Sequence, residues 1–242
     1  MTQDTTKEAQ HTKMSMFKQG ITTGIPITLG YIPVAITFGV LAFQSGLSLL
    51  ELTLMSALVY AGASQFMGVN MIVASASMIE IVIATFVLNF RHFVMSLSFM
   101  NSIREFVSLR GRVGISLGLT DEAFAVAAMN QDKAKNQHAV YFYIGIFLSG
   151  YLAWITGSLA GGIVGEVIPE QLSQSMGIAL YALFISLLIP SVKKEFRYGL
   201  IALVAMLINT IAIQFMSSGW AIVVGTVLGG FSGVFLLKEK YE

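Results

Sequence analysis

Long apolar runs with few or no charges alternate with short polar stretches along this chain. A helix that crosses a hydrocarbon core of about 30 Å needs roughly 20 apolar residues, and seven stretches approach or exceed that length. They cover residues 20–46, 52–79, 81–100, 113–129, 139–165, 171–192 and 198–237. The last run is about twice as long as one crossing needs, and residues 217–219 offer a turn in its middle. The pattern predicts an all-α, polytopic transmembrane helix bundle of about seven to eight segments.

The positive charges predict how these segments cross. Lys and Arg accumulate on the cytoplasmic side of membrane proteins. Apart from Arg91, they gather here near residues 7–18, 104–112, 133–135, 193–197 and 238–240. Eight crossings put both termini in the cytoplasm but leave the basic loop 101–112 outside, against the rule. A re-entrant fourth segment, with one of the first three failing to cross fully, would remove the conflict. The sequence leaves eight spans and six or seven spans open.

Glycine and proline mark places where the first two segments can be interrupted. Gly30 and Pro33 lie inside the first segment, which also contains Pro26. A proline removes a backbone donor and kinks or breaks a helix. In the second segment, the stretch from Gly62 to Gln65 offers a similar break. Broken helices expose backbone groups that can meet a charged solute, so we expect Gly30, Pro33 and Gly62 to act in helix breaking or gating.

The polar start and the spacing of short identities predict the domain organisation. Residues 1–17 are polar and mixed in charge, which predicts a disordered cytoplasmic tail ahead of one transmembrane domain, 18–240. At an offset near 120, Tyr60-Ala61 recurs as Tyr181-Ala182. Chance matches are common in sequences rich in Gly, Ala and Leu, so the alternatives of coincidence and a duplication (18–129 and 139–237) both stay open. Internal repeats are typical of transporters, which hold their substrate near the membrane midplane.

Composition narrows the classes of function. Hydrophobic residues make up 55% and charged residues 11% of the 242 residues, whereas soluble domains carry about 25% charged residues. The chain has no cysteine and three scattered histidines, so we expect no disulfide, metal or other cofactor. The net charge of +1 implies no nucleic-acid partner. We also find neither a phosphate-binding loop nor a Gly-flanked nucleophilic serine, so an enzyme is not expected.

Ionisable side chains inside two segments are candidates for chemistry. Asn89, Arg91 and His92 fall near the middle of the third segment, and Asp121 and Glu122 in the short fourth one. A charge at mid-bilayer costs about 2.5–3.5 kcal/mol on insertion scales, so it tends to pair or to line a cavity. Arg91 could be a structural clamp paired with one carboxylate, or it could bind a solute carboxylate or gate its path.

The other candidates have comparable alternatives. His92 could switch its charge near neutral pH, and one acidic residue could receive an ammonium group or a coupling proton. At the membrane interface, both acids would be merely solvated. Ser64 and Gln65 place hydrogen-bonding groups at membrane depth, in a run of small residues that can also serve as a packing seam. A mid-membrane cavity lined by Gln65, Asn89, Arg91 and one acid is the expectation for a transporter.

The order of these motifs resembles the AzlC family. The resemblance covers about residues 17–237 and consists of G-x-P at 24–26, GxxP at 30–33, FG at 38–39, AGASQF at 61–66, N-x-R-H at 89–92 and TDEAF at 120–124. Phe90 stands where family members often have leucine. The resemblance implies the large subunit of a two-component exporter of valine, leucine and isoleucine, with methionine as a further candidate substrate, and a small AzlD-type membrane subunit as partner. It marks as functional Gln65, Asn89, Arg91, His92, Asp121 and Glu122.

Energy source, direction and class remain to be tested. Without a nucleotide-binding loop, a proton gradient is the expected energy source. The alternatives are a permease or importer for another small zwitterion, an intramembrane enzyme using the same charged groups, and a membrane scaffold without its own transport site. A scaffold would carry its buried charges on the lateral surface instead of around a central cavity.

Overall fold

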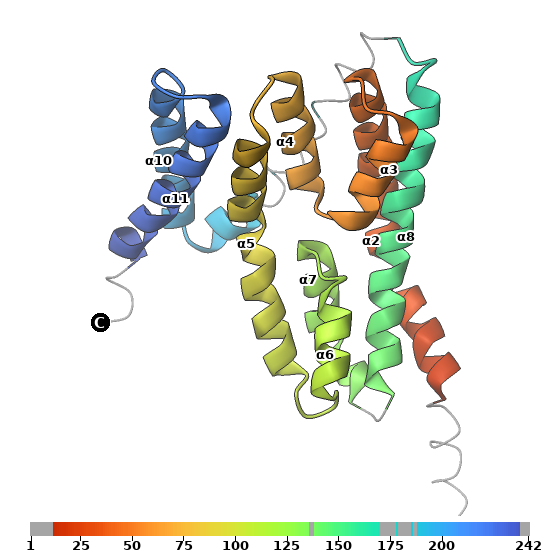
Figure 1. Cartoon of the computed structure of the whole chain (residues 1–242). Helices are drawn as coiled ribbons and strands as arrows, with labels where there is room; N and C mark the ends of the chain where they lie inside the picture. The colour runs from red at the N-terminus through yellow and green to blue at the C-terminus, as the bar shows by residue number, and fades with distance from the viewer. Residues whose placement is uncertain (1–11, 136–137, 170–177, 179–184, 186–187, 238–242) are drawn as a thin grey trace, which may run out of the picture.

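The computed structural model describes residues 12–135, 138–169, 178, 185 and 188–237, and in these residues it is entirely helical (Figure 1). The elements are α2 (Lys13–Gln44), α3 (Leu49–Leu58), α4 (Gly62–Val73), α5 (Met78–Ser102), α6 (Leu109–Ser116), α7 (Asp121–Met129), η1 (Gln131–Ala134), α8 (Ala139–Gly165), α10 (Arg197–Ala212) and α11 (Ser218–Leu237). Four helices are long and apolar enough to cross a membrane, namely α2, α5, α8 and most of α11. The prediction of an all-α membrane bundle is confirmed.

Helices α2 and α8 form the central pair and run in the same direction. Gly20 of α2 meets the backbone of Phe142 near the start of α8, and Gly39 meets the backbone of Ser158 further along. A Cβ at either glycine would overlap a carbonyl oxygen of α8. Small residues allow two helix backbones to approach this closely, which is how helices pack in lipid. The pair therefore forms a tightly packed scaffold.

Helix α2 differs from the sequence expectation at two points. It begins at Lys13, ahead of the predicted boundary at residue 18, because Thr12 caps it by accepting a hydrogen bond from the Ser15 amide at 3.2 Å. It also continues through Pro26 and Pro33 without interruption. The break expected at Gly30–Pro33 was therefore wrong. Membrane helices tolerate proline when neighbouring groups satisfy the freed backbone, and the close packing on α8 holds α2 together.

Helices α3 and α4 form a hairpin that does not cross the bundle. Met55 lies against Gly68, and the Ser56 hydroxyl accepts a hydrogen bond from the side-chain amide of Gln65 at 3.0 Å. Met55 precedes Ser56, but its contact Gly68 follows Gln65. The two helices are therefore antiparallel, and the chain turns back on itself. The turn lies at residues 59–61, where Tyr60 has a positive φ of 44°. The interruption predicted at Gly62–Gln65 thus falls just before Gly62, the first residue of α4.

Local sequence signals explain the outer ends of this hairpin. Before α3, the Ser48 hydroxyl accepts from the Glu51 amide at 3.3 Å and the Glu51 carboxylate accepts from the Ser48 amide at 2.8 Å. Before α5, Ser77 and Glu80 make the same pair of bonds. Each pair is a capping box that satisfies free amides at a helix start. The connections from α2 to α3 and from α4 to α5 are therefore determined by short local motifs.

Helices α6 and α7 form a second hairpin that enters from the opposite end of the bundle (Figure 1). Gly111 lies against Val140 and Gly118 against Phe147, so α6 follows the first half of α8. The chain then turns back at residues 117–120. The side chain of Gln131, just after α7, donates to the Ser102 hydroxyl at the end of α5 at 3.2 Å. The fourth segment thus turns back within the helix bundle, and its re-entry into the membrane stays a prediction.

The two hairpins resolve the charge conflict. Because the second and fourth apolar segments turn back in the described residues, the structure favours the alternative of fewer than eight spans. The loop 101–112 lies on the same side as the start of α2, where the Arg112 guanidinium donates to the Met100 carbonyl at 3.1 Å. By the positive-inside rule this side faces the cytoplasm. Among the described residues, the opposite ends of the long helices carry the acids Glu51, Glu80 and Glu166 and no Lys or Arg.

Helices α10 and α11 form an antiparallel pair beside α5. Gly229 faces Ala205 and Gly225 faces Asn209. The Ser217 hydroxyl donates to the Glu80 carboxylate at 2.5 Å, which attaches the pair to the outer end of α5. The predicted sixth segment, 171–192, lies mostly outside the described residues, as do the partners Tyr181 and Ala182 of the suspected repeat. The duplication therefore stays a prediction.

Candidate functional site

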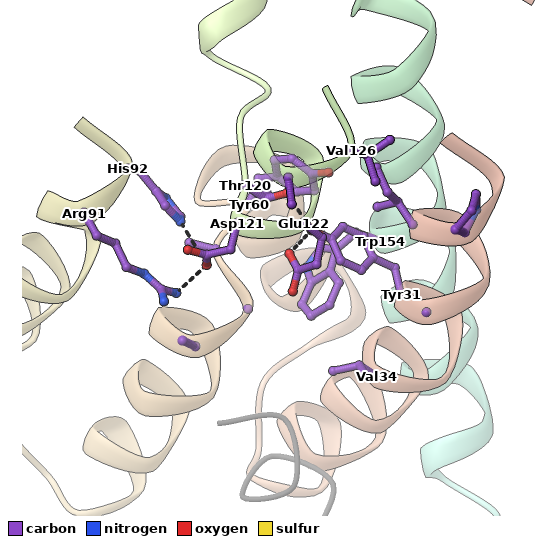
Figure 2. A pocket seen from close by; sticks show the side chains of 17 residues that line it. Tyr31, Val34, Tyr60, Arg91, His92, Thr120, Asp121, Glu122, Val126 and Trp154 are labelled. Carbon is purple, nitrogen blue, oxygen red and sulfur yellow. Dashed lines mark hydrogen bonds and ion pairs between the residues drawn. The ribbon is translucent and has the colours of Figure 1, made fainter. Parts of the chain in front are cut away.

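The tips of the two hairpins meet at a cavity of about 420 Å³ in the middle of the bundle. This volume lies within the range of small-molecule sites. The walls come from α2, both hairpin tips, α5 and α8 (Figure 2). Residues far apart in the sequence therefore contribute to one site, as expected for a transporter that binds between broken helices.

One side of the cavity holds an ionic cluster. The Arg91 guanidinium lies 3.0 Å from the Asp121 carboxylate, and His92 Nε2 lies 3.8 Å from the same oxygen. Figure 2 shows both side chains reaching from α5 toward Asp121. The side chains of Arg91 and Asp121 keep 37% and 25% of their surface exposed. The pair is thus accessible from the cavity, and a moderate rearrangement of α5 or α7 could separate it.

The start of α7 places both acids in the cavity. Thr120 caps the helix by accepting from the Ala123 amide at 3.3 Å. This cap puts Asp121 and Glu122 in the first turn, where the free amides and the helix dipole favour negative charge. The local sequence therefore keeps two carboxylates at the cavity, inside a bundle of apolar helices where isolated charges are disfavoured.

Glu122 has a different environment from Asp121. The Tyr31 hydroxyl donates to its carboxylate at 2.6 Å and lies 2.6 Å from the Thr120 hydroxyl. Among the described residues, no Lys, Arg or His lies within ion-pair distance of Glu122. Asp121 is therefore paired with Arg91, whereas Glu122 has no cationic side chain beside it among the described residues.

Aromatic and aliphatic side chains form the rest of the wall. The rings of Tyr31 and Trp154 pack edge to face at 5.4 Å, beside Ile27, Val34 and Val126. Such a wall can hold an aliphatic side chain, while the polar groups fix its orientation. An apolar cavity with one unpaired carboxylate suits a small molecule that has a cationic end and an apolar end.

The tip of the first hairpin contributes backbone more than side chains. Ala61 precedes α4 without any side-chain cap, and Gly62 lines the cavity without a side chain. The free amides at this helix start can meet a negative group. Tyr60, just before them, has a conformation that costs about 1–3 kcal/mol for a residue with a side chain, and its buried hydroxyl has no hydrogen-bond partner among the described residues. Strain of this kind often accompanies a functional position.

The structure separates the predicted residues into two groups. Arg91, His92, Asp121, Glu122, Gly30 and Gly62 line the cavity. Pro33 does not line it, and neither do Ser64, Gln65 and Asn89, so the expectation that Gln65 and Asn89 would do so was wrong.

These polar side chains join helices behind the cavity. The Ser64 hydroxyl donates to Asn89 at 2.6 Å, which links α4 to α5. Gln65 is fully buried and accepts from the Trp154 indole at 2.8 Å, which fixes one aromatic wall. The polarity of the motif therefore serves packing at these three positions, because buried polar groups must be hydrogen-bonded. Any direct contact of these residues with a substrate stays a prediction.

Sequence reasoning did not select Tyr31, Tyr60, Thr120 or Trp154. The Thr of TDEAF carried a signal, because Thr before an acidic first turn is a typical helix cap. Tyr31 and Tyr60 lie inside or next to the family motifs but are ordinary residues in an apolar helix. No cluster of three His, Asp or Glu side chains that could hold a metal ion occurs in the described part of the chain.

Fold and site together define a polytopic helix-bundle membrane protein with a central cavity between two opposed re-entrant hairpins. The AzlC protein family matches residues 26–168. The chain is 33% identical over 228 residues to an uncharacterized membrane protein of Archaeoglobus fulgidus, which covers 91% of this chain and 97% of that protein. The chain belongs to the AzlC family, a family of transporters and not of enzymes.

Two further relatives bear on location and function. Inner membrane protein YgaZ of Escherichia coli is 30% identical, over 88% of this chain and 87% of its own. Branched-chain amino acid transport protein AzlC of Bacillus subtilis is 24% identical, over 75% of this chain and 70% of its own. No solved structure matches. The chain is a multi-pass membrane protein, because it has several helices long and apolar enough to cross a membrane. The name of its relative YgaZ, an inner membrane protein, agrees with this.

Proposed function

We propose that this chain is the large subunit of a secondary transporter that exports branched-chain amino acids through the cavity between its hairpin tips. The observation that carries the proposal is the pairing of an apolar aromatic wall with Glu122, a cavity carboxylate without a cation among the described residues. An amino acid supplies the missing ammonium group and an aliphatic side chain for the wall. The name of the Bacillus subtilis relative supports the same substrate class.

The ionic cluster has the features of a gate coupled to protons. Arg91 and His92 hold Asp121 from α5, on the other side of the cavity from α2. Protonation of Asp121 would weaken its attraction to Arg91 and release the tip of the second hairpin from α5. A proton gradient could thereby drive the change between two accessible states, which is the general requirement for alternating access.

A small AzlD-type membrane subunit is the proposed partner. Only 6% of the residues in the most apolar stretch of α5 are buried, compared with 44% in α2 and 50% in α8. A long helix with this exposure needs lipid or a second protein along most of its length. A partner on α5 would adjoin the ionic cluster directly, which gives the second subunit a physical route to influence the gate.

The decisive experiment measures intracellular leucine and valine after feeding their dipeptides to exporter-deficient cells. We expect lower accumulation when this chain and its small partner are expressed together, and loss of that effect in Glu122→Gln. Asp132→Asn is the matched control, because Asp132 is an acid in an exposed loop with Lys135 as its partner. Unchanged accumulation with normal membrane insertion would reject branched-chain export and favour another zwitterion or a scaffold role.

A further inference from the structure

A second cavity lies next to the central one, on the cytoplasmic side. Its volume is about 780 Å³, and it follows the length of α6 between the first half of α8 and the second half of α5. Arg110 lies at one end, near the start of α6, and the tip of the first hairpin closes the other end. Because the start of α6 is on the basic side of the bundle, this cavity spans the cytoplasmic half of the protein.

Two side chains, Tyr60 and His92, line both cavities. The Tyr60 ring packs edge to face against Tyr31 at 6.5 Å on the central side and against Tyr151 at 5.0 Å on the other. Its hydroxyl is buried without a hydrogen-bond partner among the described residues. His92 Nε2 lies 3.8 Å from the Asp121 carboxylate. These two residues form the wall between the cavities.

Polar side chains occur among the residues that line the second cavity. They are His92, Ser96, Arg110 and Ser116. Gly114 also lines it and has open space where a side chain would stand. Polar groups at such a site favour water over lipid chains.

The charges suit an amino acid that arrives from the cytoplasm. Among the described residues, Arg110 and His92 are the ionisable groups other than tyrosine that line the second cavity, and no acidic side chain does so. The central cavity adds Asp121 and Glu122 beyond the wall. The second cavity therefore favours the carboxylate of an amino acid. The central cavity, beyond Tyr60 and His92, favours its ammonium group.

We propose that the second cavity is the aqueous vestibule through which the amino acid enters from the cytoplasm, and that Tyr60 and His92 form the gate between vestibule and substrate cavity. The substrate rests on the proposed function, whereas the vestibule and the gate rest on the two cavities and their shared wall. Tyr60 acts here as a gating residue, and its strained hairpin tip allows the ring to swing without unfolding a helix.

The absence of cysteine allows a direct test in the full chain co-expressed with its small partner. Single cysteines are introduced as Gly114→Cys in the vestibule and Ala125→Cys in the central cavity. A membrane-impermeant cationic methanethiosulfonate is applied to inside-out and right-side-out vesicles. We expect Gly114→Cys to react at least tenfold faster from the cytoplasmic side. Ala125→Cys should react slowly from that side, and at least tenfold faster after Tyr60→Ala.

Matched controls separate access from folding. Val167→Cys, exposed just beyond the outer end of α8, should react only from the outer side, whereas Val82→Cys on the exposed face of α5 should react from neither. Tyr60→Phe keeps the ring and should leave the Ala125→Cys rate unchanged. If Tyr60→Ala fails to insert, His92→Ala opens the same wall and should give the same increase.

Two results would overturn the inference. An unreactive Gly114→Cys would mean that lipid or a partner helix fills the second cavity. If neither Tyr60→Ala nor His92→Ala changes the labelling rate of Ala125→Cys, these two residues do not form a gate. The proposed substrate is tested separately, because leucine should slow the labelling of Ala125→Cys. If leucine gives no protection while the pattern of access holds, the substrate assignment fails and the vestibule stands.

Discussion

The pair α2–α8 and the helix α5 are all long enough to cross a membrane, yet they are held in different ways. Half of the most apolar stretch of α8 is buried, against 6% of that of α5. Glycines bring α2 and α8 into backbone contact, whereas α5 is joined to the hairpins through polar side chains such as Arg91 and Asn89. The difference indicates a fixed scaffold on one side of the cavity and a movable element on the other.

This division explains where the charges are placed. An ion pair within the scaffold would be locked by packing on every side, and breaking it would disrupt the fold. The pair between Arg91 and Asp121 instead joins α5 to the start of α7, and these two helices touch far less than α2 and α8 do. A change of charge there can shift one element against another while the scaffold persists.

The largest expected effect is on the scaffold. A Cβ at Gly39 would overlap the Ser158 carbonyl and one at Gly161 the Ile36 carbonyl. Overpacking of this kind costs typically about 1–3 kcal/mol, so Gly39→Ala and Gly161→Ala should each lower thermal stability in detergent, and together abolish stable insertion. Gly230→Ala is the control, because nothing lies within 4 Å of its Cβ position. Equal melting temperatures for all three variants would show that the close packing of α2 on α8 is not a scaffold that stabilises the protein.

The second effect distinguishes a clamp from a gate at α5. Arg91→Met leaves Asp121 without its guanidinium, and Asp121→Asn leaves Arg91 without its carboxylate. If the pair were only a structural clamp, the double variant would recover both stability and transport, as uncharged replacements of ion pairs often do. We expect it to recover stability while transport stays at least tenfold reduced. The test measures transport and thermal unfolding of the two single variants and of the double variant. Recovered transport in the double variant would show that the pair is only a structural clamp.

The smallest effect concerns the bond between Ser64 and Asn89. Removing one partner of such a hydrogen bond costs about 1 kcal/mol, so Ser64→Ala and Asn89→Ala should each lower stability slightly and should not change which amino acids are carried. The control is again Asp132→Asn, where the hydrogen bond from Lys135 lowers the pKa of an exposed carboxyl. An exposed pair contributes little. A changed substrate preference in either test variant would place these residues in contact with substrate.

Much of the site was accessible to sequence reasoning because its chemistry is unusual for lipid. Charges at mid-segment are rare, so Arg91, His92, Asp121 and Glu122 could be selected without a structure, and all four line the cavity. Gln65 and Asn89 were selected by the same reasoning but bond to neighbouring helices instead. Polarity at membrane depth indicates that a partner exists. It does not tell whether that partner is a solute or another helix.

The sequence by itself determined the membrane class and the set of charged residues, because hydropathy and charge can be read locally along the chain. It could not determine that residues 52–79 turn back, since the run is long enough to cross and Tyr60 is not a glycine. Only the tertiary structure decided that two hairpin tips meet, that Asp121 pairs with Arg91 while Glu122 meets Tyr31, and that two cavities share one wall. These features depend on contacts between distant segments, and such contacts are chosen by packing against a common scaffold.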